Sequence, residues 1–577
     1  MLPAPWLPTA WLRTRRLPAT RLPSAPIPAA PREKHPSGRG LVRRPFALLS
    51  AAAALTAALT GAPAATADTD PPPGEPATAT ADPLPAWQTN GTVWTVAIVG
   101  GTVYAGGSFT AIRPPGTAPG DPAEIPRGGL AAFDAATGEP LPWNPLVEAN
   151  PGNEATVEDL EPSPDGRTLY VGGRFTKING LSRPRIGSFS LPGGALTGFR
   201  HEMESAVETL AATGSTVYAG GSFTTVDGVP RARLAAFAAS DGSLTAWAPA
   251  ADRRVMSMIV SPDGSRVVIG GKFNTLNGNP PHGLGAVRTD ATGTSAPWQT
   301  GLEYVSDSRQ SWATDMVADG DTVYVGAAGT GTFDGRLAVD PDGGALRWID
   351  NCLGGTETVS LLEGVLYSGS HAHDCSTQPG GFPSLNGSHQ RLLAEPARPD
   401  PAQYDTPPIL HWFPDTDGGA GTDNQGPRAM DNDGRYLWVG GDFTTVNGRS
   451  QQGLTRFGTL AVQADTTPPQ PLAAPTVAPP AGSSGALTVT WTQSWDRDNR
   501  RLTYRVVRDG TTVVHTLDSA SAFWDLAKLT YTDTGLAPGS AHTYTVRATD
   551  HFGNTTESPP AGPVQAGLAR SGGEAQR

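Results

Sequence analysis

The stretch LWVGGDFTTVNGRSQQGLTRF, residues 437–457, places two adjacent glycines inside a run that otherwise reads as a β-strand. Glycine weakens a strand interior, so it needs a reason such as a bulge or the close approach of another backbone. Copies of the pattern begin at Val103, Leu169, Val217 and Val267, and two degenerate copies begin at Val323 and Leu366. The spacings of about 43 to 71 residues indicate an array of similar units.

Each unit has the same internal order. A short first strand, such as 157–160, is followed by a tight Asp-Gly turn such as 163–166, and Asp-Gly between apolar runs is a hairpin signal. The glycine-bearing strand comes second, a third strand such as 130–134 follows, and a fourth carries an aromatic residue. These aromatic residues are Trp143, Phe199, Trp247, Trp298, Trp348 and Trp412. Four antiparallel strands in each of seven units predict an all-β fold with a seven-bladed β-propeller over 84–462.

The two ends of this region predict how the ring closes. The last unit stops after its third strand, 454–457, and an unclaimed strand with Trp87, 84–88, precedes the first unit. We expect this amino-terminal strand to complete the last blade, because a ring must protect its edges. The paired glycines then lie near the axis, where blades crowd, and the GG-x-F motif is interpreted as scaffold.

Strand direction predicts which face carries function. Long insertions fall between second and third strands or between blades, and both kinds of loop lie on one face, here called the insertion face. The insertions are residues 111–129, 144–156, 370–391 and 414–427. Cys352 and Cys375 also fall on this face in adjacent blades, and they are predicted to form a disulfide.

A candidate metal site lies beside the second cysteine. His371 and His373 are two residues apart on an extended segment, so with Asp374 they can share a divalent metal, and His411 is a possible further ligand. The alternative is that these side chains only order the loop through hydrogen bonds. The acidic loop 415–423 is a candidate calcium site, but it lacks the EF-hand spacing and is expected to be a solvated loop. A divalent metal or calcium is thus a candidate, and no cofactor is certain.

Candidate catalytic residues are confined to the predicted channel. The first strands carry the carboxylates Glu158, Asp159, Glu208, Asp315 and Glu357. Glycoside hydrolysis needs two such groups flanking one bond. The same strands also carry Trp94, Thr95, Thr209 and Ser257, so no pair is singled out, and polar residues that satisfy the channel are the favoured interpretation. No motif of a serine hydrolase, zinc protease or P-loop occurs.

The amino terminus predicts export. Within residues 1–67 a basic segment, a short apolar segment and an A-x-A site form a secretory signal, and 1–41 is interpreted as an over-extended start. The whole chain carries a net charge of −12 and the first 67 residues carry +8, which leaves −20 for the exported part. Such an acidic product is expected not to bind nucleic acid. The apolar segment of the signal is too short and too rich in alanine to span a membrane. Residues 68–83 are expected to be a disordered linker.

A second module follows the propeller. Residues 463–475 form a proline-rich linker, 476–567 contain alternating strands that predict a β-sandwich, and 568–577 are expected to be a disordered tail. Through Trp491, Tyr504 and the stretches LAPGSAHTY (536–544) and VRATDHFGN (546–554), this module resembles a fibronectin type III domain. The resemblance implies that Tyr544 is the tyrosine-corner residue.

The propeller resembles secreted actinobacterial proteins with delta-60-type repeats, through GGSFT, GGRFTKING and QQGLTRF. That resemblance implies an exported propeller without a settled activity. The favoured hypothesis is a secreted, non-catalytic binding or cell-envelope protein whose insertion face recognises an extracellular ligand, with polysaccharide as the candidate and a monomer favoured. The alternative is an extracellular glycoside hydrolase, or an accessory protein of polysaccharide breakdown, that uses the axial carboxylates.

Overall fold

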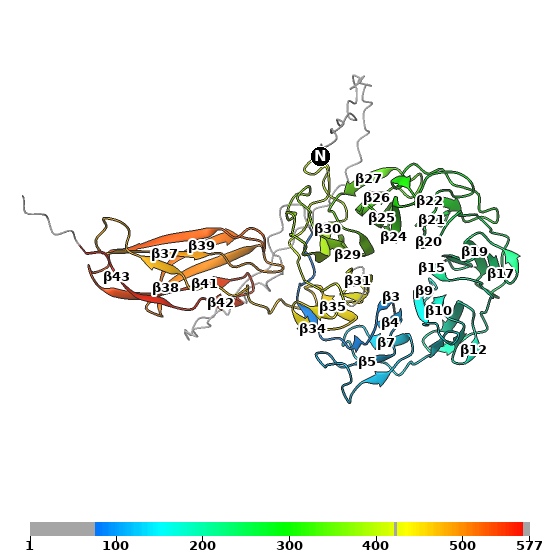
Figure 1. Ribbon diagram of the computed structural model, residues 1–577, viewed down its shortest axis with the longest axis horizontal. Coiled ribbons are helices and arrows are strands. Elements are labelled where there is room, and N and C mark those ends of the chain that lie inside the picture. The colour runs from blue at the N-terminus through cyan, green and yellow to red at the C-terminus, as the bar shows by residue number, and fades with distance from the viewer. Residues whose placement is uncertain (1–75, 420–423, 569–577) are drawn as a thin grey trace, which may run out of the picture. The chain divides into compact units, whose positions relative to one another are not determined.

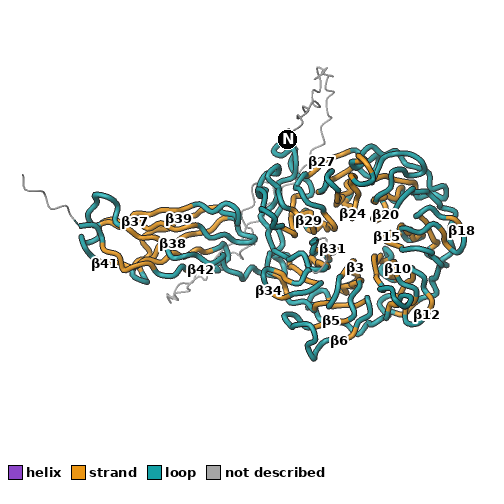
Figure 2. Tube along the Cα trace, in the orientation of Figure 1, coloured by secondary structure: helices purple, strands orange, loops and turns teal. Residues whose placement is uncertain are grey.

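The computed structural model describes residues 76–419 and 424–568, and every regular element there is a strand (Figure 2). The predicted signal peptide, the first half of the 68–83 linker (68–75) and the tail beyond Leu568 lie outside the described residues. In the described part no helix is long and apolar enough to cross a membrane.

The strands of residues 83–458 form a β-propeller, in which small antiparallel sheets surround a central opening (Figure 1). The sheets consist of β3 (Val93–Val99), β4 (Thr102–Gly107) and β7 (Leu130–Asp134); β9 (Thr156–Pro162), β10 (Thr168–Arg174), β13 (Ile186–Ser190) and β14 (Ala195–Leu196); β15 (Val207–Ala212), β16 (Thr216–Gly221) and β19 (Leu234–Ala238); β20 (Val255–Val260), β21 (Arg266–Gly271) and β22 (Leu284–Arg288); β23 (Tyr304–Ser306), β24 (Arg309–Asp319), β25 (Thr322–Gly329), β26 (Gly335–Val339) and β27 (Leu346–Asp350); β28 (Thr356–Leu362), β29 (Val365–Ala372) and β30 (Gln390–Pro396); and β31 (Pro427–Asn432), β32 (Tyr436–Gly441), β35 (Leu454–Gly458) and β1 (Pro83–Leu84).

The glycine pairs make this arrangement possible. Gly172 pairs with Asp159 and Gly173 pairs with Val157, so Glu158 is left over in a β-bulge. A Cβ on Gly173 would fall on the carbonyl oxygen of the bulged strand, and a Cβ on Gly172 would lie 2.8 Å from Cγ1 of Val207 in the next sheet. The register shift recurs in the innermost strands of the other sheets. Both expected reasons for the glycines, a bulge and close approach between blades, are confirmed.

The ring closes with an amino-terminal strand, as predicted, but one that ends earlier. β1 (Pro83–Leu84) pairs with β35, whereas Gln88 and Thr89 form β2, which pairs with β5 (Ala111–Arg113). Trp87 lies between the two strands, and its Nε1 donates to Glu139 3.0 Å away.

The segment before β1 is ordered, contrary to the expectation that a disordered linker reaches residue 83. The backbone N–H of Thr80 donates to Gly458, and that of Ala79 donates to the Tyr367 hydroxyl. The side chains of Ala79 and Ala81 are buried in an apolar cluster of the last sheets. Apolar burial and satisfied backbone groups therefore hold this segment in place.

The predicted fourth strands are mostly shorter than expected. In several sheets the position is only a single bridge, such as Phe133 with Pro140. Their aromatic residues nevertheless pack between sheets. The Trp143 ring, for example, meets the Tyr104 ring edge-on with centroids 5.2 Å apart and the Phe189 ring at 5.0 Å.

Short strands on the insertion face and a separate set near the carboxyl end complete the fold. The first are β6 (Ile125–Pro126), β8 (Val147–Glu148), β11 (Lys177–Ile178), β12 (Leu181–Ser182), β17 (Thr225–Val226), β18 (Val229–Pro230), β33 (Thr445–Val446) and β34 (Arg449–Ser450). The second are β36 (Thr476–Ala478), β37 (Ala486–Thr492) and β40 (Lys528–Thr534) in one sheet, and β38 (Arg501–Arg508), β39 (Thr512–Ala520), β41 (Ala541–Thr549), β42 (Thr555–Glu557) and β43 (Ala561–Gln565) in another. Trp491, Tyr504 and Tyr544 are buried in one core between these two sheets, and the Tyr544 hydroxyl donates to Asp533 at 2.8 Å.

Candidate ligand site at the channel mouth

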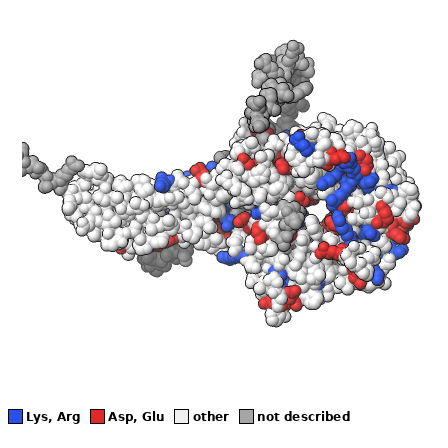
Figure 3. All heavy atoms as spheres, in the orientation of Figure 1, with Lys and Arg blue, Asp and Glu red and all other residues white. Residues whose placement is uncertain are grey.

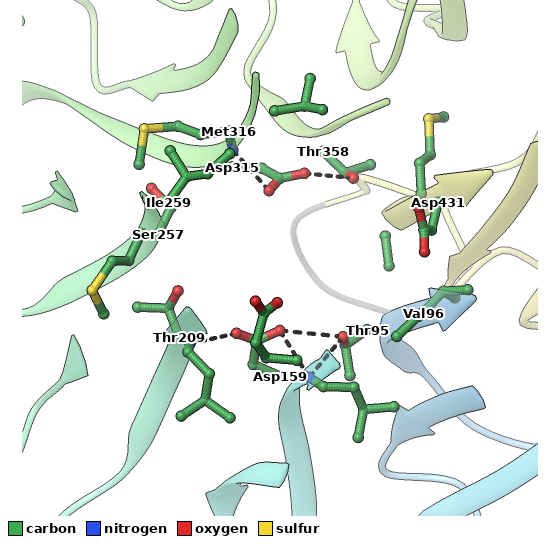
Figure 4. A pocket seen from close by; sticks show the side chains of 18 of the residues that line it. Thr95, Val96, Asp159, Thr209, Ser257, Ile259, Asp315, Met316, Thr358 and Asp431 are labelled. Carbon is green, nitrogen blue, oxygen red and sulfur yellow. Dashed lines mark hydrogen bonds between the residues drawn. The ribbon is translucent and has the colours of Figure 1, made fainter. Parts of the chain in front are cut away.

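The innermost strands enclose a cavity of about 490 Å³ along the propeller axis (Figure 4). All five predicted axial carboxylates line it: Glu158, Asp159, Glu208, Asp315 and Glu357. Trp94, Thr95, Thr209 and Ser257 line it as well. The sequence therefore assigned these side chains to the correct place, and the geometry separates them into two levels.

The deeper level consists of carboxyls that join neighbouring sheets. Asp159 accepts the backbone N–H of Leu210 at 2.6 Å, and Asp315 accepts that of Val359 at 2.9 Å. Asp431, which the sequence analysis did not select, accepts the N–H of Ile98 at 2.7 Å and so links the last sheet to the first. Figure 4 shows Asp159 and Asp315 pointing into the cavity from opposite sides. These carboxyls occupy the backbone donors of the next innermost strand, which is a structural role.

Their environment makes ionisation unfavourable. Burial raises the pKa of Asp159 and of Asp431 to about 7, although backbone N–H donors oppose the shift. Burial also raises the pKa of Asp315. The three side chains are half-buried, and each lines the cavity.

The outer level lies where the innermost strands begin, at the mouth of the channel on the insertion face. The bulge in each of these strands pushes one extra residue out of the ladder at this point, and a bulge is a common way to re-aim a side chain. The bulged residues are Trp94, Glu158, Glu208, Met256, Thr314, Glu357 and Arg428. This set lines the cavity and is called the bulge ring below.

A second set of mouth residues comes from the variable position of the GG-x-F motif. Arg174 Nε donates to the bulged Glu158 at 2.6 Å, and the Ser222 hydroxyl donates to the bulged Glu208 at 2.7 Å. Asp442 pairs with the bulged Arg428 at 3.4 Å. In these three copies the residue after the glycine pair contacts the side chain that the bulge presents. The sequence analysis treated the whole motif as scaffold and missed this position, which differs among the copies.

Two cation–aromatic pairs occur in this region. The ammonium of Lys272 lies 3.6 Å from the ring centroid of Trp312, and the guanidinium of Arg428 lies 4.9 Å from that of Trp94. Arg254 forms an ion pair with Glu208, whose side chain is only 4% exposed. Figure 3 shows Lys and Arg gathered on one side of the opening, over β15 and β20. A locally cationic rim on an acidic chain favours ligands with anionic or strongly polar groups.

The cysteines form a disulfide, as predicted, and it is buried with Phe382 and Phe413. Two of the candidate metal ligands beside the disulfide have other hydrogen-bond partners. Asp374 accepts hydrogen bonds from the backbone and the hydroxyl of Ser376, so it serves a local turn. The His411 Nε2 lies 2.9 Å from the backbone oxygen of Asp496, and burial lowers the pKa of His411 to about 4.

The acidic loop considered for calcium lies partly outside the described residues, because 420–423 are not placed. Within the described part, Asp417 accepts hydrogen bonds from the backbone N–H groups of Thr444 and Thr445. Its carboxylate therefore ties the loop to the hairpin that follows β32.

The structure also contains a buried ion cluster that the sequence analysis did not predict. The Arg336 guanidinium is fully buried and donates to Glu395 at 2.7 Å and to Asp350. Arg336 and Asp350 lie on paired strands β26 and β27, and Glu395 lies on β30 of the next sheet. No local pattern marks these three positions, because only the packing of two sheets brings them together.

Comparisons with known proteins add little to this geometry. No family model matches the chain, and no curated protein sequence matches it. Among solved structures, the RRP9 WD40 repeats are similar at 12% identity, covering 67% of this chain and 99% of that one, with a TM-score of 0.36. The hydrazine synthase of Kuenenia stuttgartiensis is similar at 11% identity, covering 65% and 98%, with a TM-score of 0.33. The fold and the channel define this chain as a β-propeller protein, and similarity at these scores supports no inference about its ligand.

Proposed function

We propose that this chain is a secreted, non-catalytic binding protein that recognises an extracellular polysaccharide at the channel mouth. In this proposal the propeller has seven blades, and the carboxyl-terminal module is a fibronectin type III domain. The signal-like segment in 1–67 supports export, and the buried disulfide is compatible with an oxidising compartment.

The observation that supports binding is the composition of the mouth. Indole rings at Trp94 and Trp312 lie beside charged groups that can exchange hydrogen bonds with sugar hydroxyls. A concave opening with a few convergent polar groups is the usual form of a small-ligand site. The bulge ring is built on the innermost strands of the sheets, so its side chains are presented from regular elements and not from loops.

The same geometry disfavours catalysis by the axial carboxylates. Asp159 and Asp315 are bound by backbone N–H groups of the next sheet, and Glu158 and Glu208 are each bound by an arginine. The alternative of a glycoside hydrolase keeps one supporting observation, which is that Glu158 and Glu208 occupy the equivalent bulge of adjacent sheets. Two carboxylates that face one opening are the minimum that such chemistry needs.

One experiment separates the two functions. Residues 68–577 are incubated with a panel of plant, fungal and bacterial polysaccharides, and both retention on the polymer and release of reducing ends are recorded. We expect retention without release, and we expect Trp94→Ala/Trp312→Ala to abolish retention. A matched aromatic control, Tyr531→Ala in β40, should bind normally. Release of reducing ends that Glu158→Gln/Glu208→Gln stops, while retention persists, would instead establish the hydrolase.

A further inference from the structure

Three histidines gather on the insertion face beside the disulfide. The ring centroid of His389 lies 5.7 Å from that of His371 and 6.2 Å from that of His373, and both ring pairs meet nearly edge-on. Rings that share one tetrahedral zinc have centroids about 5 Å apart, because each ligating nitrogen is about 2.0 Å from the metal. Among the described residues the ligand atoms of the three histidines do not all lie within 4.8 Å of one another, so binding one ion requires side-chain rotations that bring their nitrogens together.

The backbone that carries these histidines is held from several directions. β29 and β30 change register between Gly369 and Ala372, and this irregularity contains His371. The N–H of His373 donates to the carbonyl of Leu353 at 2.9 Å, and its own carbonyl accepts the N–H of Leu385 at 3.0 Å. The disulfide at Cys375 fixes the segment two residues further on. The site is therefore preorganised by a hairpin, two backbone bonds and a covalent link.

A hydrogen-bond relay orients one of the rings. The side-chain amide of Gln425 donates from Nε2 to Glu357 at 3.2 Å, which leaves its Oε1 as an acceptor. That oxygen lies 2.7 Å from His371 Nδ1, so Nδ1 carries the proton and the lone pair of the neutral ring is on Nε2. A metal-binding histidine characteristically donates its other ring N–H to such a partner. Glu357 in the bulge ring is thereby connected to the histidine cluster.

The other two rings lack the hydrogen-bond partners that several other histidines of the chain have. His201 and His542 each pair with an aspartate at 2.7 Å, and His282 is bound on both nitrogens. Among the described residues, the His373 ring makes no hydrogen bond or ion pair, and His389 has only a 3.4 Å contact with the amide of Asn424. The carboxylates of Asp334 and Asp374 lie close enough to interact with this cluster, and a bound cation would use the lone pairs of the imidazoles.

We propose that His371, His373 and His389 form a site for a divalent transition metal of the zinc type. The sequence analysis had selected Asp374 as the third ligand, and His389 takes its place because the chain folds back before β30. Three histidines leave the fourth tetrahedral position open. An ion held there presents that position to water or to an acidic group of a ligand on the insertion face. The proposal does not depend on the polysaccharide function.

The test uses residues 68–577 without a polyhistidine tag. Isothermal titration with ZnCl₂ should show one saturable site, and Co²⁺ should give the visible absorption of a tetrahedral nitrogen-ligated ion. His373→Ala and His389→Ala should each weaken Zn²⁺ binding at least about tenfold. The control His551→Ala removes an exposed histidine from the carboxyl-terminal module and should leave binding unchanged. Unfolding curves in urea should confirm that each variant is folded.

Two results would overturn the proposal. The first is the absence of saturable Zn²⁺ binding by the folded wild-type chain. The second is binding that survives both His373→Ala and His389→Ala. In the second case the alternative location is the buried group Asp465, Asp496 and Asp498, whose oxygen ligands should also bind Ca²⁺. Competition by Ca²⁺ and loss of binding in Asp498→Asn would then place the ion there.

Discussion

The contact between Gly172 and Val207 allows a quantitative test of how the blades pack. An alanine at residue 172 would place its Cβ 2.8 Å from Val207 Cγ1 and 3.3 Å from Val207 Cβ in the next sheet. Overpacking of this kind costs about 1–3 kcal/mol, partly offset by about 0.4–1 kcal/mol because alanine restricts the unfolded chain. We therefore expect Gly172→Ala to lower the free energy of unfolding by about 1–2 kcal/mol.

The diagnostic measurement is the double mutant. Val207 is fully buried, and Val207→Ala alone should cost about 2 kcal/mol through lost burial and a cavity. Because Val207→Ala also removes the atom nearest the new methyl group, Gly172→Ala/Val207→Ala should cost at least about 1 kcal/mol less than the sum of the two single changes. Equilibrium urea denaturation measures all three values. Additivity within about 0.5 kcal/mol would refute the steric argument.

The matched control for this cycle is Gly173→Ala. Its Cβ would meet the backbone carbonyl of Thr156 in its own sheet, and no side-chain change in the next sheet can relieve that contact. Gly173→Ala should therefore be additive with Val207→Ala. If Val207→Ala rescued both glycine variants equally, the effect would be general softening of the core and would say nothing about close approach between blades.

Three further predictions concern ionisation, the disulfide and the buried ion cluster. Burial raises the pKa of Asp431 to about 7, so above pH about 4 the native state binds more protons than the unfolded state. The free energy of unfolding should therefore fall as pH rises from about 5 to 7. Asp431→Asn should make that fall smaller, and a pH profile unchanged by the substitution would contradict this prediction. The disulfide joins residues separated by 23 positions, so Cys352→Ser/Cys375→Ser should lose roughly 3 kcal/mol, and dithiothreitol should destabilise the wild type but not the variant in urea. Arg336→Met leaves the buried Asp350 and Glu395 without their cation and should lower the free energy of unfolding by about 3–5 kcal/mol. The triple variant Arg336→Met/Asp350→Asn/Glu395→Gln should recover most of that stability. If it does not, packing and not charge is responsible for the loss.

The repeated motif predicted the propeller because it is a local solution repeated many times. Paired glycines imply a bulge, Asp-Gly turns imply hairpins, and an amino-terminal strand without a partner implies closure of the ring. The structure contains the bulges, the hairpins and the closing strand. Trp87 was placed in the closing strand, but Pro83 and Leu84 form it, because register along an edge depends on partners that the sequence does not show.

The site was less predictable because its parts come from different sheets. The five axial carboxylates were placed correctly, but only the hydrogen bonds to Leu210 and Val359 show that Asp159 and Asp315 are structural. Asp374 was a candidate to share a metal with His371 and His373, and its carboxylate binds Ser376, while His389 comes from the far end of the same insertion. The residue after the glycine pair was the one local signal available, since it varies from Arg174 to Ser222 and Lys272 on an otherwise constant motif.

The central claim is that the channel mouth on the insertion face binds the ligand. Its most direct test is the dissociation constant of residues 68–577 for a polysaccharide that retains the chain, measured for the wild type and for Arg174→Ala/Lys272→Ala. Both side chains lie at the mouth and are not part of the glycine scaffold. The affinity of the double variant should therefore be at least about tenfold lower than that of the wild type, while its stability in urea is unchanged. The control variant Arg547→Ala in β41 should bind as the wild type does. Unchanged affinity in Arg174→Ala/Lys272→Ala, together with a loss in Arg547→Ala, would place binding on the carboxyl-terminal module and contradict the account.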